Sequence, residues 1–143
     1  VLMAAWRLTL ARISGQAEFA LGTVLFGRNA PEVQSLLGGF VQTARSQIPL
    51  RPDMTFGQLC QAEQGASADL LGQEGTLDGD LSRDSFQATF NYRGYPTRGL
   101  TLEGCNCEEY ALEAQTAAFP LGFNVEPDGA GYAIELLWQR ACF

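Results

Sequence analysis

The sequence has no histidine, and this absence removes the side chain that most often transfers protons near neutral pH. No serine stands in a G-x-S-x-G turn, and no glycine-rich phosphate loop is present. The four cysteines are Cys60, Cys105, Cys107 and Cys142. They have no histidine to complete a metal site, and the C-x-C spacing is tighter than that of the usual zinc ligands. We therefore expect no catalytic residue, no bound metal and reduced thiols in these 143 residues.

Lysine is also missing, so all nine basic residues are arginines. They are spread unevenly against the acidic residues: five arginines face three acids in residues 1–62, but three face ten in residues 63–113. Phosphate backbones require a basic surface, so this acidic middle argues against a nucleic-acid partner. The acidic residues form either an ordinary solvated face or a surface that repels wrong partners.

Long apolar runs are absent as well. No stretch has the length of a transmembrane helix, and no secretory leader precedes the first element. The length suits one domain, residues 1–143, with a core of its own. Because the sequence opens inside an apolar helix without a start methionine, we expect a segment of a longer, cytoplasmic polypeptide without membrane contact.

The first half of the sequence predicts two helices and two strands. Thr55 and Gln58 form a capping box at the start of the second helix, and Gly15 is a C-cap candidate for the first. The apolar run 19–26 is typical of a strand covered on both faces. The predicted elements are helix 1–13, strand 19–26, a helical turn at 32–37, strand 40–50 and helix 55–71.

The second half predicts further strands. A loop at 72–80 leads to three segments that alternate between apolar and polar residues, and a turn signal at 127–131 joins the last two into a hairpin. The predicted segments are 86–93, 119–126 and 132–139, with additional strands at 100–103 and 107–114. The fold class is therefore α+β: a mixed sheet of about five or six strands with helices packed on one face.

Several short motifs follow one another in a recognisable order. They are L-A-R-x-S-G-Q at 10–16, G-R-N-x-P-E at 27–32, a G-x-F-V-x-T pattern ending at Thr43, and Ser82-Arg83. This ordered set resembles the condensation domains of nonribosomal peptide synthetases, and more specifically the start of their C-terminal half. The resemblance covers the whole chain and implies one lobe of a chloramphenicol-acetyltransferase-like fold.

The resemblance also implies a site and partners. The family has two lobes with a tunnel between them, and carrier-bound substrates enter the tunnel from both ends. Its HHxxxDG signature belongs to the N-terminal lobe. The implied partners are carrier domains, which bear phosphopantetheine, and adjacent synthetase domains, while no cofactor binds this chain directly. The tunnel or lobe-junction candidates are Arg28, Gly39, Phe40, Gln42, Thr43, Ser82 and Arg83.

The motif residues allow more than one reading. Arg28 either closes its own loop or contacts a second lobe, and residues 39–43 either pack in the core or line the tunnel. Gln42 stands where the family has Asn, residues 84–86 are one residue shorter than the family's Asn-Pro-Leu-Phe, and a Q-D-x-P-F-E segment is missing.

Two hypotheses on function remain open. The first is a truncated, non-catalytic condensation-type domain that acts as a structural or docking platform, and the sequence favours it because of the missing histidine and the altered motifs. The second is the C-terminal half of an amide-bond-forming enzyme that needs an N-terminal lobe carrying HHxxxDG. A weaker third hypothesis is an unrelated acyltransferase of similar fold, because fold does not fix chemistry.

Overall fold

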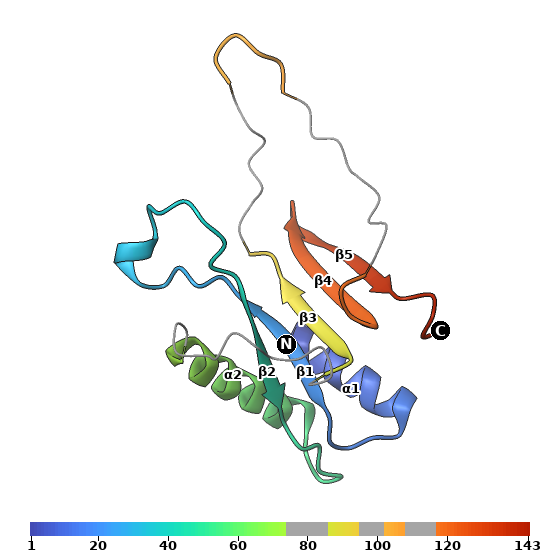
Figure 1. Ribbon diagram of the computed structural model, residues 1–143. Coiled ribbons are helices and arrows are strands. Elements are labelled where there is room, and N and C mark those ends of the chain that lie inside the picture. The colour runs from blue at the N-terminus through green and yellow to red at the C-terminus, as the bar shows by residue number, and fades with distance from the viewer. Residues whose placement is uncertain (74–85, 95–101, 108–116) are drawn as a thin grey trace.

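The computed structural model describes residues 1–73, 86–94, 102–107 and 117–143. These residues form two α-helices, one 3-10 helix and a five-stranded sheet (Figure 1). In chain order the elements are α1 (Leu2–Ser14), β1 (Ala20–Leu25), η1 (Pro31–Val33), β2 (Gln42–Gln47), α2 (Phe56–Gly72), β3 (Ala88–Tyr92), β4 (Leu121–Asp128) and β5 (Gly131–Trp138).

The sheet is mixed, with the strand order β2-β1-β3-β4-β5. The central strand β3 runs parallel to both of its neighbours, β1 and β4. The two outer pairs, β1 with β2 and β4 with β5, are antiparallel. Two helices and a mixed five-stranded sheet confirm the predicted α+β class.

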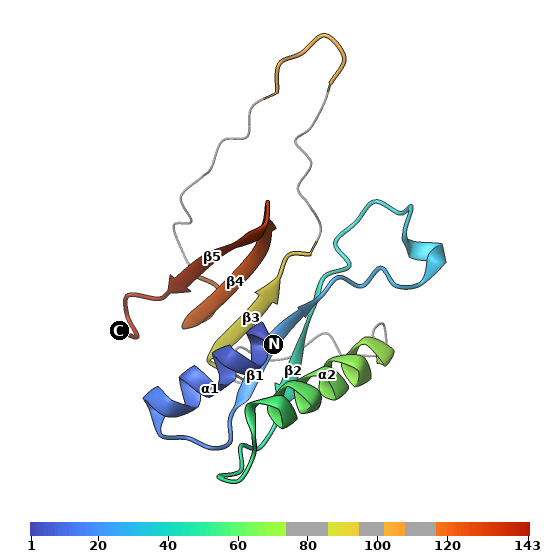
Figure 2. The same cartoon turned by 180° about the vertical axis from the view of Figure 1, so that it is seen from behind.

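Both helices lie on the same face of the sheet, which is turned toward the viewer in Figure 2. Trp6 of α1 stacks on Phe123 of β4, with 4.6 Å between the ring centroids. The core beneath α1 joins this helix to three neighbouring strands through Met3, Trp6, Leu21, Phe90 and Val125. A second cluster, Ala4, Ile48 and Leu59, joins α1 to α2. The helix layer therefore covers the sheet from β2 to β4.

The helix ends are those that the sequence predicts. Gly15 follows α1 with a φ of 71°, in the left-handed region that favours glycine. The Thr55 side chain accepts a hydrogen bond from the backbone N–H of Gln58, and the Gln58 side chain accepts one from the backbone N–H of Thr55. This reciprocal capping box fixes the start of α2.

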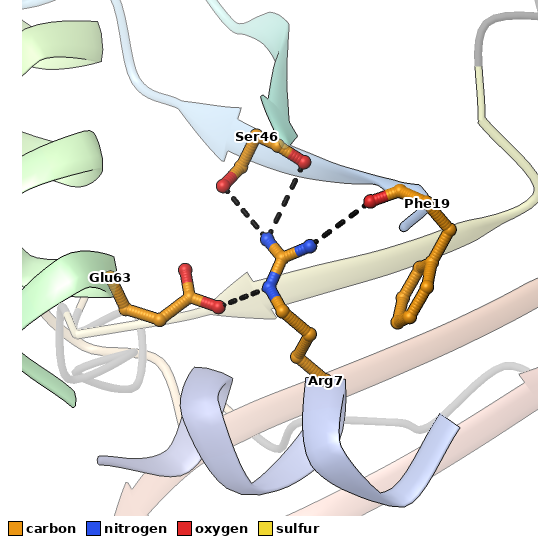
Figure 3. Close-up of polar contacts among 4 residues, drawn as sticks. All are labelled: Arg7, Phe19, Ser46 and Glu63. Atoms are coloured by element: carbon orange, nitrogen blue, oxygen red, sulfur yellow. Dashed lines mark hydrogen bonds and ion pairs between the residues drawn. The ribbon is translucent and has the colours of Figure 1, made fainter. Parts of the chain in front are cut away.

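A buried polar cluster holds α1, α2 and the sheet in register (Figure 3). The Arg7 guanidinium is completely buried and pairs through Nε with the Glu63 carboxylate of α2. Its two Nη atoms donate to the Phe19 carbonyl at 3.2 Å and to the Ser46 hydroxyl at 2.9 Å. Three partners, from α2, from β2 and from the residue just before β1, thus share one guanidinium, which satisfies the buried charge through hydrogen bonds as well as through the ion pair.

Strand β1 is covered on both faces, as its apolar run predicts, but part of the cover comes from an unexpected residue. A Cβ atom placed on Gly22 would lie 2.3 Å from the Phe86 ring, so this ring lies directly over the glycine. Gly22 pairs with Thr89, whereas Phe90 pairs with Thr23 on the helix-covered face. The alternation in 86–93 placed Phe86 on the same face as Phe90, and this is wrong because Phe86 precedes the regular strand.

The other predicted bounds change locally. Strand 40–50 shortens to β2, because residues 38–41 are held in the preceding loop. Strand β4 continues to Asp128, so the hairpin turn reduces to Gly129 and Ala130, with Gly129 at a φ of 56°. Of the predicted strand 100–103, Leu102 and Glu103 are not part of a strand, and the rest lies outside the described residues, as does nearly all of 107–114.

Candidate functional site

The sequence motif around Arg28 becomes a loop between β1 and β2 that stands clear of the sheet (Figure 1). The Arg28 guanidinium donates three hydrogen bonds to carbonyl oxygens of this same loop: Val33 at 3.0 Å, Leu36 at 2.8 Å and Gly38 at 2.9 Å. The guanidinium therefore holds three carbonyls around one centre, and the farthest of them lies ten residues after Arg28 in the sequence. The structure confirms that Arg28 closes its loop.

Two further contacts fix the conformation of the loop. The guanidinium lies over the Phe40 ring, 4.6 Å from its centroid, in a cation–π arrangement. Gly27 has a φ of 67°, and a Cβ atom there would come within 1.9 Å of the Phe40 carbonyl oxygen. Only glycine fits such a close approach of two backbone segments. The two ends of the loop, at residues 27–28 and at Phe40, are thus in direct contact with each other.

The pinned loop displays apolar side chains to solvent. Leu36 is 50% exposed, Val41 is 61% exposed and Leu37 is as exposed as in an extended peptide. Single exposed apolar residues are ordinary on protein surfaces, but three on one ordered loop form a contact patch. We call Leu36, Leu37 and Val41 the loop patch.

A cleft of about 440 Å³ lies beneath this loop, between the loop and the end of α2. Its lining includes Gly39, Phe40 and Gln42 of the G-x-F-V-x-T motif, together with Leu71 of α2. Thr43 follows in β2, where it pairs with Val24 and is half-buried. The structure therefore brings five of the seven candidate residues to one region, namely Arg28, Gly39, Phe40, Gln42 and Thr43. Ser82 and Arg83 lie outside the described residues.

The chemistry of this region is that of recognition. Its polar groups are a guanidinium occupied by carbonyls, a glutamine amide and backbone groups. None of these is a nucleophile with an adjacent base. Within residues 1–73, 86–94, 102–107 and 117–143, no group of three or more metal-ligating side chains comes together. In the same ranges, no helix is long and apolar enough to cross a membrane.

Sequence reasoning overlooked the buried pair of Arg7 and Glu63. In the sequence, Glu63 is the charged member of a mostly apolar stripe along its helix, and Arg7 interrupts an otherwise apolar helix. A lone charge on each of two buried helix faces, with opposite signs, is the signal that could have predicted the pair.

Comparison with known proteins decides the family. The sequence model described as "Condensation domain" matches residues 1–143. The chain belongs to the condensation domain family. Among curated proteins, surfactin synthase subunit 1 of Bacillus subtilis is 28% identical over 155 aligned residues, and the match covers 100% of this chain and 4% of that protein. Cyclosporin synthetase simA of Tolypocladium inflatum is 36% identical over 129 residues, or 81% of this chain and 1% of that protein.

Solved structures show the same condensation fold. The starter condensation domain of rhizomide synthetase RzmA matches with a TM-score of 0.73 and 20% identity, over 99% of this chain and 35% of that domain. A four-domain nonribosomal peptide synthetase, AB3403, matches with a TM-score of 0.74 and 13% identity, over 94% of this chain and 12% of that one. The chain thus spans about a third of a solved condensation domain and a few per cent of the curated relatives.

Proposed function

We propose that residues 1–143 are the C-terminal lobe of a condensation-type domain and act as a non-catalytic docking platform within a peptide synthetase. The observation that carries this proposal is the pinned loop, which holds Leu36, Leu37 and Val41 in solvent on a fixed backbone. A surface ordered before its partner arrives loses little entropy on binding. The absence of histidine from the same residues fits a role in contact and not in proton transfer.

The partners in this proposal are the opposite lobe, carrier domains with their phosphopantetheine arms, and adjacent synthetase domains. In this proposal the loop patch meets the opposite lobe, because its three side chains are at least 50% exposed on a loop that projects beyond the sheet (Figure 1). Fully burying a leucine contributes about 1.5–3 kcal/mol, so Leu36 and Leu37 are the anchors of this contact. Nucleic acid is not among the partners, since the formal net charge is −7.

The cleft beneath the loop favours a second candidate function. Because Gly39, Phe40 and Gln42 line a space of about 440 Å³, the same lobe can form one wall of a substrate tunnel. In that case the lobe is half of an amide-bond-forming enzyme, and an N-terminal lobe with HHxxxDG supplies the histidine. The wall then positions substrate while the other lobe carries out the proton transfer.

An amide-formation assay with loaded donor and acceptor carrier proteins tests both candidates. The chain is assayed alone and then with the histidine-bearing N-terminal lobe of a related condensation domain, while binding to each component is followed by calorimetry. The platform proposal expects binding without product in either reaction. Product that appears only with the added lobe overturns the platform in favour of the half-enzyme, and product from the chain alone overturns both.

Matched variants test the loop patch itself. Leu37→Gln is expected to weaken binding to the N-terminal lobe at least about tenfold, because the central anchor is lost. Leu102→Gln is the control, since Leu102 is 52% exposed but lies outside the patch. Equal affinity of the two variants would show that this loop is not the docking surface.

A further inference from the structure

Two cysteines, Cys105 and Cys107, occupy exposed positions one residue apart, and all four cysteines of the chain are free thiols. Their exposure is unusual, because free cysteine is among the residue types most often buried. The other two thiols have different surroundings. Cys60 is half-buried against the core cluster between α1 and α2, and the Cys142 thiol donates to the Gln139 Oε1 at 3.6 Å. Neither of these has a second cysteine close to it in the sequence.

An ordered turn leads into the pair. The backbone N–H of Cys105 donates to the Leu102 carbonyl at 3.1 Å, and Gly104 has a φ of 78°, in the left-handed region that favours glycine. The segment 102–107 is the orange arc that stands apart from the sheet and from both helices in Figures 1 and 2. It contributes to neither core cluster. A dissolved reagent therefore reaches both thiols without any opening of the core.

The spacing of the two cysteines permits a bond between them. An extended chain advances at most about 3.6 Å per residue, so the two Cα atoms lie no more than about 7.2 Å apart. A disulfide requires a Cα separation of about 4.4–6.8 Å. A modest bend at Asn106 is enough to reach this range. Because Asn106 belongs to neither a helix nor a strand, the bend breaks no ladder of backbone hydrogen bonds.

We propose that Cys105 and Cys107 form a reversible thiol–disulfide site for small-molecule disulfides, written RSSR. One thiol gives its proton to solvent, and its sulfur attacks RSSR, which forms a mixed disulfide and releases RS⁻. The second thiol, deprotonated in the same way, attacks the cysteine sulfur of the mixed disulfide, closes the ring and releases another RS⁻. Both RS⁻ ions take up protons. The chain thus loses two electrons and two protons, and RSSR is reduced to two RSH.

The ring explains why the bond is reversible. Exposed or strained disulfides are the ones that ordinary thiols reduce easily, whereas structural disulfides resist reduction. A ring with one intervening residue, Asn106, also restrains very little of the unfolded chain, so the bridge adds little stability. The site therefore responds to the redox poise of its surroundings, while the fold stays the same in both states.

The charge around the pair selects the reagent. Glu103 lies two residues before Cys105, and Glu108 directly follows Cys107 in the sequence. Residues 63–113 as a whole carry ten acids against three arginines. Like charges repel an anionic disulfide such as oxidised glutathione and attract a cationic one such as cystamine. The site is therefore selective for cationic over anionic disulfides.

Intact-mass analysis of the full chain tests the bond. The variant Cys60→Ser, Cys142→Ser keeps only the pair and is treated with cystamine. We expect this chain to lose two hydrogens, to show no titratable thiol and to recover both thiols in dithiothreitol. The mixed disulfide should stay below about a tenth of the chain, because ring closure is intramolecular. The matched control adds Cys105→Ser, so its single remaining thiol must end as a stable mixed disulfide.

Two cystamine adducts on the pair, or disulfide-linked dimers of the chain, would overturn the proposal. An unchanged Tm verifies that the serine variants are folded, since the segment 102–107 lies outside both core clusters.

Reaction rates test the selectivity. The ratio of the cystamine rate to the oxidised glutathione rate is measured relative to the same ratio for N-acetylcysteinamide, an uncharged thiol. At low salt this relative ratio should be at least about ten, and it should fall toward one in about 1 M salt, where charges are screened. Glu103→Gln should lower it, because one of the flanking charges is removed. A relative ratio of one at low salt would overturn the role of charge.

Discussion

At the scale of single residues, the Arg7–Glu63 pair is the most consequential feature of the core. Both side chains are almost completely buried, and one carboxylate oxygen of Glu63 has no hydrogen-bond partner among the residues that the structure describes. Removing only one member of such a pair leaves the other charge buried and uncompensated. Arg7→Ala is therefore expected to lower the free energy of unfolding by about 3–5 kcal/mol, measured by urea denaturation.

The matched control for this pair replaces both charges at once. The double variant Arg7→Met, Glu63→Leu keeps apolar volume at both positions, so its stability should lie near or above that of the parent chain. If the double variant is as unstable as Arg7→Ala, the cluster is held by shape and by the bonds to Ser46 and Phe19, and the ion pair is not its centre.

Two glycines that look alike in the sequence should respond in opposite directions to alanine. At Gly22 a Cβ atom meets the Phe86 ring at 2.3 Å, so Gly22→Ala is expected to lower the free energy of unfolding by about 1–3 kcal/mol. At Gly65, in the exposed middle of α2, a Cβ atom meets nothing within 4 Å. Gly65→Ala should raise stability by about 0.5–1 kcal/mol.

Thermal and urea unfolding of the two alanine variants decide this prediction together. A stable Gly22→Ala variant would mean that the Phe86 ring moves aside at little cost. That outcome would also mean that Phe86 does not act as a fixed cover over Gly22.

At the scale of elements, the loop between β1 and β2 depends on one side chain. Each of the three Arg28 hydrogen bonds is worth about 0.5–1.5 kcal/mol, so Arg28→Ala should open the loop locally by more than 1.4 kcal/mol. Limited digestion with chymotrypsin should then cleave at Leu36 or Leu37 at least about tenfold faster. The overall midpoint of urea unfolding should change little, because the loop lies outside both core clusters.

Arg45→Ala is the control for the loop. Arg45 lies in the adjacent strand, is exposed and donates only to the Gln47 side chain in the described contacts. Its removal should leave the cleavage rate at Leu36 and Leu37 unchanged. If the two arginine variants are cleaved alike, the loop is ordered by its backbone alone and the platform proposal loses its rigid surface.

Elements were predictable from sequence where the deciding forces are local. The capping box at Thr55 and Gln58, the glycine after α1 and the period of β4 and β5 all act within a few residues. The start of β2 was not predictable, because Phe40 stays in the loop through its contact with Arg28, which lies twelve residues earlier in the sequence. The resemblance to condensation domains pointed to Arg28 and Phe40 as candidate residues, but a contact between residues this far apart in the sequence could not be predicted from it.

At the scale of the whole molecule, net charge opposes association through an exposed apolar surface. Among the described residues β5 is an edge strand, and its side chains Tyr132, Ile134, Leu136 and Trp138 are 46–58% exposed, which is a known route to association. The formal charge of −7 at pH 7 opposes it, and this repulsion vanishes as the pH approaches the sequence pI of about 4.4. Light scattering should therefore stay low near pH 7 and rise steeply as the pH falls toward 4.4.

The edge strand can be separated from charge in this experiment. Adding Ile134→Thr and Leu136→Gln leaves the net charge unchanged but removes apolar surface from β5, so scattering should begin closer to the pI. If scattering begins at the same pH in this variant, the surface that drives association lies elsewhere, for instance at Leu36, Leu37 and Val41.

The position of β3 in the sheet has a consequence for synthesis on the ribosome. The helices and the β1–β2 pair are encoded before residue 73, yet the inner edge of β1 is completed only by Ala88–Tyr92. The far side of β3 must wait longer still, until β4 emerges at Leu121. The growing chain therefore passes through stages in which the inner edges of β1 and then of β3 are bare, so the middle of the sheet is open to mispairing until β3 and then β4 have been synthesised.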